Sequence, residues 1–321
     1  MTAQPTAAPP TMTALRAHLR GGPEQFELEE APVPEPGEGE VLVEVHAAAI
    51  TFAELDWDLS WTRDGADRTP VIPSHEFSGT VAALGPDADG TFQLGDEVYG
   101  LVPFDRDGAA AQYVAVPLAN LGRKPVGVGH VQAAALPLAA ATAWQALVRH
   151  ARVRSAERVL IHGGAGGVGA FAVQIAAALG ADVTATVLEP QRGFVAGLGA
   201  HRVIDASAED FDGDGRAYDV VLDTVGGDVL VRSFGVLRPR GRLVSLQAPP
   251  DPELATAHDV EPLFFVVGPD PEALGAVAAL AETGRLVIPI AATFPLADGR
   301  AAYASGARSP RPPGKTVLIV R

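Results

Sequence analysis

The sequence predicts an α/β protein with two parts, a compact β-barrel-like domain and a parallel sheet covered by helices on both faces. Short apolar segments separated by proline and glycine fill the first part of the chain. Strands and helices alternate from Glu157 onward, and a glycine-rich run, Gly163–Gly169, lies where that alternation begins. The length of 321 residues is about twice the common domain size, which also favours two domains.

The first part is expected to hold short strands bounded by Gly, Pro or Asp, a spacing typical of small barrels. The predicted strands are Phe26–Glu30, Val41–Ala47, Gly79–Leu84, Glu97–Val102 and Gln112–Val116. Residues 1–13 before them are rich in Pro, Ala and Thr, and they predict a disordered tail. They do not resemble a signal peptide, because no basic stretch is followed by an apolar one.

The middle of the chain changes in character near His130. An alanine- and leucine-rich helix is expected over Val131–Val148, with an interruption near Pro137. The alternation that follows predicts a doubly wound parallel sheet. Its strands are Arg158–His162, Asp182–Val187, Arg202–Ile204, Tyr218–Thr224, Arg242–Gln247 and Leu263–Val267, and its helices are Gly167–Leu179, Gln191–Leu198, Asp228–Leu237 and Pro271–Thr283.

The last segment does not continue this alternation. A strand over Leu286–Phe294, a short helix over Leu296–Ala304 and a strand over Thr316–Val320 are expected to fold back and complete the first domain. The predicted organisation is therefore a tail over 1–13, a barrel-like domain from 14–138 and 286–321, and a parallel-sheet domain over 139–285.

Composition excludes several classes of protein. The formal charge of −15 argues against nucleic-acid binding, which requires a basic face. The absence of cysteine excludes disulfides, cysteine nucleophiles and thiolate metal sites. No apolar stretch approaches the roughly 20 residues of a membrane span, so a cytoplasmic protein without membrane contact is expected.

The glycine-rich run is the strongest motif. Gly164, Gly166 and Gly169 satisfy G-x-G-x-x-G, directly after one predicted strand and at the start of a predicted helix. Glycines at this place let the backbone approach a pyrophosphate, and the helix N-terminus supplies free N–H groups. The run therefore predicts dinucleotide binding by Gly164, Ala165, Gly166, Gly167 and Val168.

The choice of dinucleotide depends on the end of the second strand. Proteins that bind NAD place an acidic residue there for the ribose hydroxyls, whereas Val187 and Leu188 are apolar. Arg192 is placed to grip a 2′-phosphate in bidentate fashion, although a solvated arginine at a helix start is the alternative. NADPH is therefore the expected cofactor, and Glu189 keeps NADH as the less favoured choice.

Five further segments carry a resemblance to a known family. They are Val41–Ile50, Pro73–Gly79, Gly95–Gly100, Asp219–Gly227 and Gly314–Leu318. With the glycine-rich run, and in this order, they resemble the medium-chain dehydrogenase/reductase superfamily, in particular its zinc-independent quinone oxidoreductase branch. The resemblance implies a GroES-like catalytic domain, a Rossmann domain, a cleft between them for the nicotinamide, and a homodimer formed by pairing of the Rossmann sheets.

The same resemblance implies further cofactor-binding residues. Thr142 is expected near the nicotinamide ribose, and Ser245, Phe265 and Val267 are expected at strand ends that line the cofactor. Lys315, within the last marker, is also expected to bind it.

His75 and Glu76 lie where the superfamily divides. In the zinc alcohol dehydrogenases this histidine binds the catalytic zinc together with two cysteines. A catalytic zinc needs about three protein ligands, and both thiolates are impossible here. No metal is therefore predicted, and the two residues are expected to be structural.

The substrate side departs from the family pattern. Thr51-Phe52-Ala53-Glu54 stands where the quinone reductases usually have Asn-Phe-x-Asp, and Asp56 stands near a usual Tyr. Thr51 and Asp56 are therefore the candidate catalytic residues. Trp57 and Trp61 could form an aromatic wall for a flat acceptor, although tryptophans in such a loop are almost as often ordinary packing.

The resulting hypothesis is hydride transfer from NADPH to a small conjugated carbonyl, either a quinone or an α,β-unsaturated ketone. Without a metal, the developing oxyanion needs preorganised donors, such as the Thr51 hydroxyl or a backbone N–H. Two alternatives stay open. One is a specialised enoyl reductase or repurposed biosynthetic tailoring enzyme, and the other is a non-catalytic NADPH-binding redox sensor.

Overall fold

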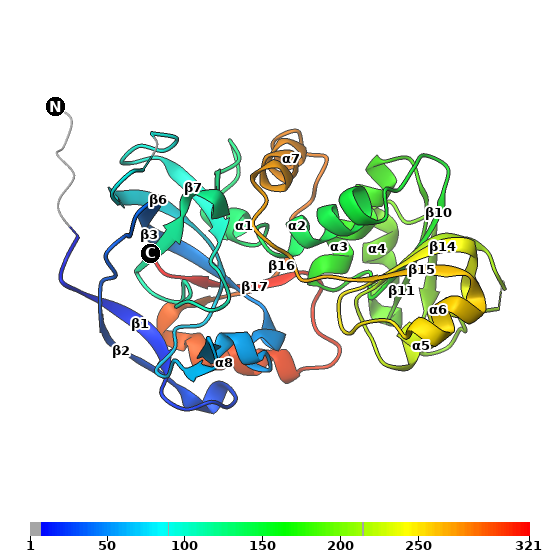
Figure 1. The fold of residues 1–321 in the computed structure, drawn as a ribbon, viewed down its shortest axis with the longest axis horizontal. Helices are drawn as coiled ribbons and strands as arrows, with labels where there is room; N and C mark the ends of the chain where they lie inside the picture. The colour runs from blue at the N-terminus through cyan, green and yellow to red at the C-terminus, as the bar shows by residue number, and fades with distance from the viewer. Residues whose placement is uncertain (1–7, 89, 214) are drawn as a thin grey trace.

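The computed structural model describes residues 8–88, 90–213 and 215–321, which form two lobes, each built around its own sheet (Figure 1). One lobe holds a six-stranded parallel sheet in the order β12-β11-β10-β13-β14-β15. This is the doubly wound order, in which two βαβαβ halves diverge from a central strand. The strands are β10 (Arg158–His162), β11 (Asp182–Val187), β12 (Arg202–Asp205), β13 (Tyr218–Asp223), β14 (Leu237–Ser245) and β15 (Val260–Phe264).

Helices connect these strands and cover the sheet. They are α3 (Gly167–Ala178), α4 (Arg192–Gly197), α5 (Asp228–Val236), α6 (Pro252–His258) and α7 (Pro271–Glu282), and they are preceded by α1 (His130–Ala134) and α2 (Ala139–Trp144). The predicted interruption near Pro137 is confirmed, because α1 and α2 lie on either side of it. None of the helices in the described ranges is long and apolar enough to cross a membrane.

The other lobe combines both ends of the chain. Its seven-stranded sheet has the order β16-β17-β3-β6-β7-β9, with β8 also paired to β3. The strands are β3 (Glu40–Ile50), β6 (Glu76–Leu84), β7 (Glu97–Leu101), β8 (Tyr113–Pro117), β9 (Leu121–Arg123), β16 (Ile290–Pro295) and β17 (Lys315–Ile319), with helix α8 (Gly299–Ala304) between the last two. Short strands β4 (Thr62–Arg63) and β5 (Ala66–Asp67) form a separate hairpin.

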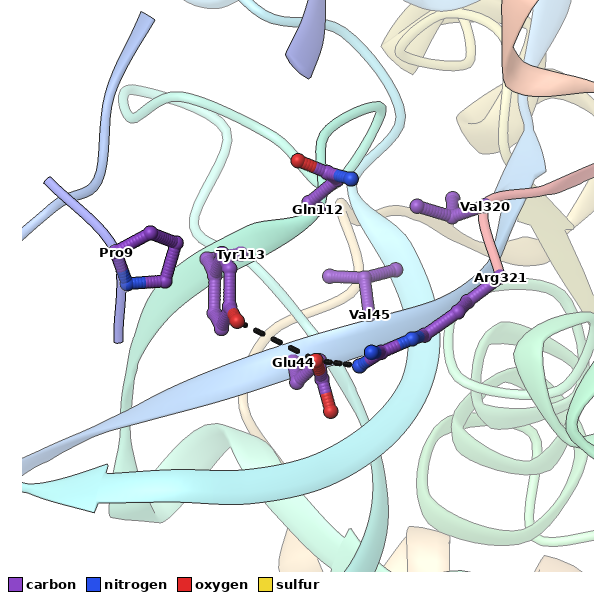
Figure 2. A pocket seen from close by; sticks show the side chains of 7 residues that line it. All are labelled: Pro9, Glu44, Val45, Gln112, Tyr113, Val320 and Arg321. Carbon is purple, nitrogen blue, oxygen red and sulfur yellow. Dashed lines mark hydrogen bonds and ion pairs between the residues drawn. The ribbon is translucent and has the colours of Figure 1, made fainter. Parts of the chain in front are cut away.

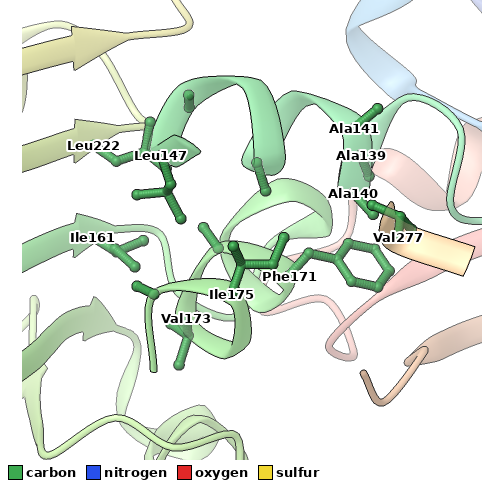
Figure 3. Close-up of a cluster of buried hydrophobic side chains, with 14 of the residues drawn as sticks. Ala139, Ala140, Ala141, Leu147, Ile161, Phe171, Val173, Ile175, Leu222 and Val277 are labelled. Carbon is green, nitrogen blue, oxygen red and sulfur yellow. The ribbon is translucent and has the colours of Figure 1, made fainter. Parts of the chain in front are cut away.

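The largest hydrophobic core lies beneath α2, α3 and α7 (Figure 3). Phe171 and Ile175 of α3 share this core with Ile161 of β10 and Leu222 of β13. The ring of Phe171 points toward Val277 of α7, and alanines of α2 allow the helices to approach closely. Burial of each large apolar side chain contributes about 1.5–3 kcal/mol. This core runs across the predicted boundaries at 138/139 and 285/286, so the domain limits themselves stay a prediction.

Parts of the predicted local structure were wrong, including the strand expected over Leu263–Val267, which covers Val260–Phe264 in the structure. Strand β1 (Thr11–Ala17) begins inside the expected tail and pairs along its whole length with β2 (Phe26–Pro32), because this register buries Met12 and Leu15 in the core. The part of the tail over 1–7 lies outside the described residues. Helix α6 was missed, although Asp251 caps it by accepting from the N–H groups of Glu253 and Leu254.

Candidate active site

The glycine-rich run forms a tight turn between β10 and α3. Gly163 has φ of 73°, a conformation that favours glycine. A Cβ on Gly169 would lie 2.1 Å from the carbonyl oxygen of Gly163, and one on Gly164 would lie 2.8 Å from Cβ of Ala185 on β11. Glycine is therefore required at these positions for the turn to pack against the helix and the second strand.

The start of α3 presents unpaired backbone N–H groups. Gly166 is the N-cap, and the first hydrogen bond within the helix runs from Ala170 N to Gly166 O, at 3.0 Å. The N–H groups of Gly167, Val168 and Gly169 come before that bond, so they are available to an anion at the positive end of the helix dipole. This loop fits the pyrophosphate of a dinucleotide.

The other predicted cofactor residues differ in their burial and in their contacts. Ser245 is fully buried at the carboxyl end of β14, and Thr142 is buried on α2 with its hydroxyl donated to Leu138 O, at 2.6 Å. Phe265 and Val267 follow the end of β15. The ring of Phe265 packs on His150, with centroids 4.4 Å apart, while the side chain of Val267 packs in the core. Only the backbone of Val267 is therefore free to meet a ligand.

Arg192 lies at the start of α4, and its guanidinium is already bonded. Nη1 lies 2.6 Å from Glu209 Oε1, and Nη2 donates to Val203 O at 2.7 Å. At the tip of β11, Val187 is buried and Leu188 is exposed. The predicted 2′-phosphate contact therefore meets a paired arginine and not a free one.

Strand register brings three polar side chains together at the junction of the lobes. Thr316 of β17 pairs with Ile50 of β3, and Ala49 of β3 pairs with Glu76 of β6. Thr51, Glu76 and Lys315 therefore meet at one end of the sheet. Their contact could not be read from the sequence, since Lys315 lies 264 positions after Thr51.

These three side chains form a buried charged cluster. Glu76 is 1% exposed and forms an ion pair with Lys315, which is 6% exposed. The ammonium of Lys315 also donates to Thr51 Oγ1 at 2.9 Å, and Thr51 Oγ1 lies 3.3 Å from Glu76 Oε1. The second oxygen of Glu76 accepts the N–H of Leu138 at 2.9 Å, so one carboxylate ties the barrel sheet to the helical lobe.

The charged cluster adjoins the glycine-rich loop. A Cβ on Gly167 would lie 3.2 Å from Cδ of Lys315, and Gly314 N approaches Ala165 O at 3.4 Å. The structure thus brings Thr51 and Lys315 beside the predicted pyrophosphate site.

A second buried carboxylate, Glu54, was missed by sequence reasoning. It is 1% exposed and accepts from Ser74 N at 3.2 Å, from the hydroxyl of Tyr303, and from His75, whose Nδ1 lies 2.8 Å away. Burial, and then the charge of Glu54, raises the pKa of Tyr303 well above its ordinary value. The signal that could have found Glu54 was its position in the Phe-x-Asp part of the family pattern, where it replaces the aspartate.

Comparison with known proteins supports the same fold. Residues 37–126 match the alcohol dehydrogenase GroES-like domain family, and residues 198–318 match the zinc-binding dehydrogenase family. A probable mitochondrial zinc-binding oxidoreductase of Arthroderma benhamiae is 31% identical, covering 91% of this chain and 92% of its own. A quinone oxidoreductase of Pseudomonas aeruginosa is 32% identical, covering 93% of this chain and 97% of its own.

The solved structure of a quinone oxidoreductase from Coxiella burnetii superposes with a TM-score of 0.88, at 30% identity, over 97% of this chain and 100% of that one. The chain belongs to the medium-chain dehydrogenase/reductase superfamily. This confirms the predicted fold class, a GroES-like barrel domain with a parallel-sheet Rossmann domain. Members of the superfamily are oxidoreductases that use nicotinamide cofactors, and the glycine-rich loop of this member fits such a cofactor.

The residues of this superfamily member do not fit a catalytic zinc. His75 Nε2 is buried without a partner, but Glu76 and Thr51 are bonded to the ammonium of Lys315, whose charge opposes a cation. In the described ranges, one group of three His, Asp or Glu side chains has ligand atoms close enough to hold a metal ion. It consists of His18, Glu27 and Glu29 at the β1–β2 hairpin, of which His18 and Glu27 are exposed. Zinc needs about three protein ligands at one point, and the His75 region does not gather them.

The remaining predicted substrate residues have different surroundings. Trp61 is buried, with its indole N–H donated to Leu55 O at 2.9 Å, so it is a core residue and the expectation of an aromatic wall at this position was wrong. Trp57 packs edge-on against Phe104, with centroids 5.1 Å apart. Asp56 is exposed at the end of a short 3₁₀ segment, and its catalytic role stays a prediction.

A cavity of about 240 Å³ lies elsewhere on the barrel lobe (Figure 2). Tyr113 and Arg321 both point toward Glu44 within it, and Glu44 pairs with Arg321. No residue of the glycine-rich loop lines this cavity, so it is not the dinucleotide site. The other lining residues are Pro9, Val45, Gln112 and Val320.

Proposed function

We propose that this protein is an NADPH-dependent oxidoreductase that reduces a quinone or an α,β-unsaturated carbonyl without a metal ion. The observation that carries the proposal is the contact between the glycine-rich loop and the buried cluster of Thr51, Glu76 and Lys315. It supports a site in which a dinucleotide and a polarised carbonyl lie side by side.

The cofactor would be held by backbone and side-chain groups of both lobes. The N–H groups of Gly167, Val168 and Gly169 would bind the pyrophosphate, with the ammonium of Lys315 as a nearby positive charge. When bound, NADPH supplies the hydride. The apolar tip of β11 and the guanidinium of Arg192 support NADPH over NADH.

The oxyanion that develops on the substrate needs donors that are fixed in advance. Glu76 holds the ammonium of Lys315 in place, and Lys315 donates to Thr51 Oγ1. The hydroxyl of Thr51 can then turn from its 3.3 Å contact with Glu76 and donate to the substrate oxygen. Its donor strength is increased because it accepts from a cation at the same time.

No side chain is assigned as the proton donor. Asp56 is exposed, and solvent supplies the proton in this proposal. Metal independence is part of the proposal and is supported because, in the described ranges, three close metal-ligating side chains do not gather around His75.

Steady-state turnover tests the proposal. The protein, dialysed against a chelator, is mixed with NADPH or NADH and a panel of quinones, enones and enoyl thioesters, and the loss of absorbance at the reduced-nicotinamide band is followed. NADPH oxidation with a quinone or enone, unaffected by the chelator, is expected. Turnover confined to enoyl thioesters favours the enoyl reductase alternative, and cofactor binding without turnover favours a redox sensor.

The proposal also includes the oligomeric state and the cellular location of the protein. A homodimer and a cytoplasmic location are expected from the sequence. Light scattering on the purified chain measures the first, and a mass equal to one chain at micromolar concentration would contradict it.

A further inference from the structure

An ion pair occupies the place where the second and third strands of the Rossmann sheet end. The guanidinium of Arg192 and the carboxylate of Glu209 are 2.6 Å apart, and their side chains are 41% and 42% exposed. Both groups are therefore accessible to a ligand, although they form an ion pair with each other.

The backbone around β12 (Arg202–Asp205) holds this pair. Arg192 also donates to Val203 O at 2.7 Å, and Glu209 Oε1 accepts the N–H of Asp205 at 3.3 Å. The hydrogen bond from Arg192, and then that from the Asp205 N–H, lowers the pKa of Glu209 below its ordinary value. The carboxylate is therefore ionised at neutral pH.

Backbone pairing connects the region of the Arg192–Glu209 ion pair to the glycine-rich loop. Gly164 N donates to Thr186 O at 2.9 Å, which fixes the loop to the end of β11. Val187, the last residue of β11, pairs with Asp205 of β12. In doubly wound sheets, the groups at this edge meet the adenosine ribose and, in NADPH, its 2′-phosphate.

We propose that Glu209 sets the cofactor preference by competing with the 2′-phosphate of NADPH for the guanidinium of Arg192. The inference rests on the proposed function, because it concerns the same dinucleotide. An arginine neutralised by a fixed carboxylate attracts a phosphate less strongly than a free one, so NADPH must displace the Glu209 carboxylate or share Arg192 with it. The preference for NADPH over NADH is then smaller than Arg192 alone would give.

Cofactor affinities of single and double variants test this competition. NADPH and NADH are titrated by nicotinamide fluorescence against the wild type, Glu209→Gln, Arg192→Ala and the double variant, and adenosine 2′,5′-bisphosphate and AMP are titrated by calorimetry. Asp212→Asn is the matched control, since Asp212 forms an exposed ion pair with Arg232. These residues are at the surface, and thermal melts check that each variant is folded.

Glu209→Gln is expected to tighten the binding of NADPH and of the bisphosphate by up to about fivefold, the upper end for an exposed ion pair, and to leave NADH and AMP unchanged. Arg192→Ala is expected to weaken NADPH and to remove the gain in the double variant. Asp212→Asn is expected to leave the affinities for NADPH and NADH unchanged.

The results that would overturn the inference differ from those that would overturn the proposed cofactor. If the wild type prefers NADPH and Arg192→Ala removes that preference, but Glu209→Gln leaves it unchanged or reduces it, Glu209 does not compete. If the wild type binds both cofactors equally and Arg192→Ala affects both alike, the NADPH assignment fails, and with it the competition.

Discussion

Two buried carboxylates of the barrel lobe, Glu76 and Glu54, are stabilised in opposite ways. Glu76 is neutralised by the ammonium of Lys315, whereas Glu54 is held by the hydroxyl of Tyr303, the N–H of Ser74 and the ring of His75. Within the described ranges, no lysine or arginine pairs with Glu54. The contrast indicates that Glu76 keeps a positive charge beside the glycine-rich loop, while Glu54 fixes the local fold.

The largest expected effect follows from removing the charge of Glu76. Glu76→Gln leaves the ammonium of Lys315 buried without a counter-charge, and the free energy of unfolding should fall by about 3–5 kcal/mol. Urea denaturation measures the change. The double variant Glu76→Gln with Lys315→Met should recover much of the loss, and a double variant as unstable as the single one would contradict the ion-pair account.

The next effect concerns activity. Thr51→Val keeps the shape of the side chain but removes the hydroxyl that is proposed to donate to the substrate oxygen. A loss of one oxyanion donor typically lowers kcat about 100-fold, and the KM for NADPH should change little. Serine at position 51 should restore most of the rate. An unaltered kcat in Thr51→Val would remove Thr51 from the proposed chemistry.

A smaller loss is expected on the Glu54 side. Glu54→Gln keeps the volume but weakens charge-assisted bonds to Tyr303 and His75, and it should cost about 1–3 kcal/mol of unfolding free energy. The folded fraction of this variant should keep the wild-type kcat. If Glu54→Gln lowered kcat as much as Thr51→Val, the division between a chemical and a structural carboxylate would be wrong.

The last effect is a pH dependence that involves neither carboxylate, and it is the smallest when taken over one pH unit. Burial, and then the charge of Arg232, lowers the pKa of His162 from its ordinary value of 6.5 to about 3. Below pH 6.5 the His162 ring therefore binds a proton in the unfolded chain but not in the folded protein. The contribution of His162 to the free energy of unfolding is fully present above pH 6.5 and is lost as the pH falls toward 3. The slope is at most about 1.4 kcal/mol per pH unit.

Denaturation at several pH values measures this slope. His162→Gln should reduce this slope between about pH 6.5 and 4.5. An identical slope in His162→Gln and in the wild type would show that another group carries the acid sensitivity.

Sequence reasoning was most successful where interactions are local. The glycine-rich run and the strands of the Rossmann sheet follow from nearby residues, and β10 and β11 have the predicted bounds. It was less successful in the barrel lobe. The start of β1, Thr11–Thr13, was assigned to a tail because its stabilisation comes from pairing with β2, which the local composition does not reveal.

The candidate site divides in the same way. The loop around Gly166 was predicted from its motif, but the contact of Lys315 with Thr51 depends on the pairing of β17 with β3. Arg192 was singled out for the 2′-phosphate, and its partner Glu209 was missed because their contact forms across β12. Long-range register and charge pairing are what the sequence alone does not provide.

Transfer of deuterium from labelled NADPH to the product tests metal-free hydride transfer. The chelator-treated protein is incubated with an enone and NADPH that carries deuterium on the transferred position of C4, and the product is analysed by mass spectrometry and NMR. One deuterium at the β-carbon of the reduced product is expected. Product without deuterium, or activity that is lost on chelation and restored by zinc, would contradict metal-free hydride transfer from NADPH.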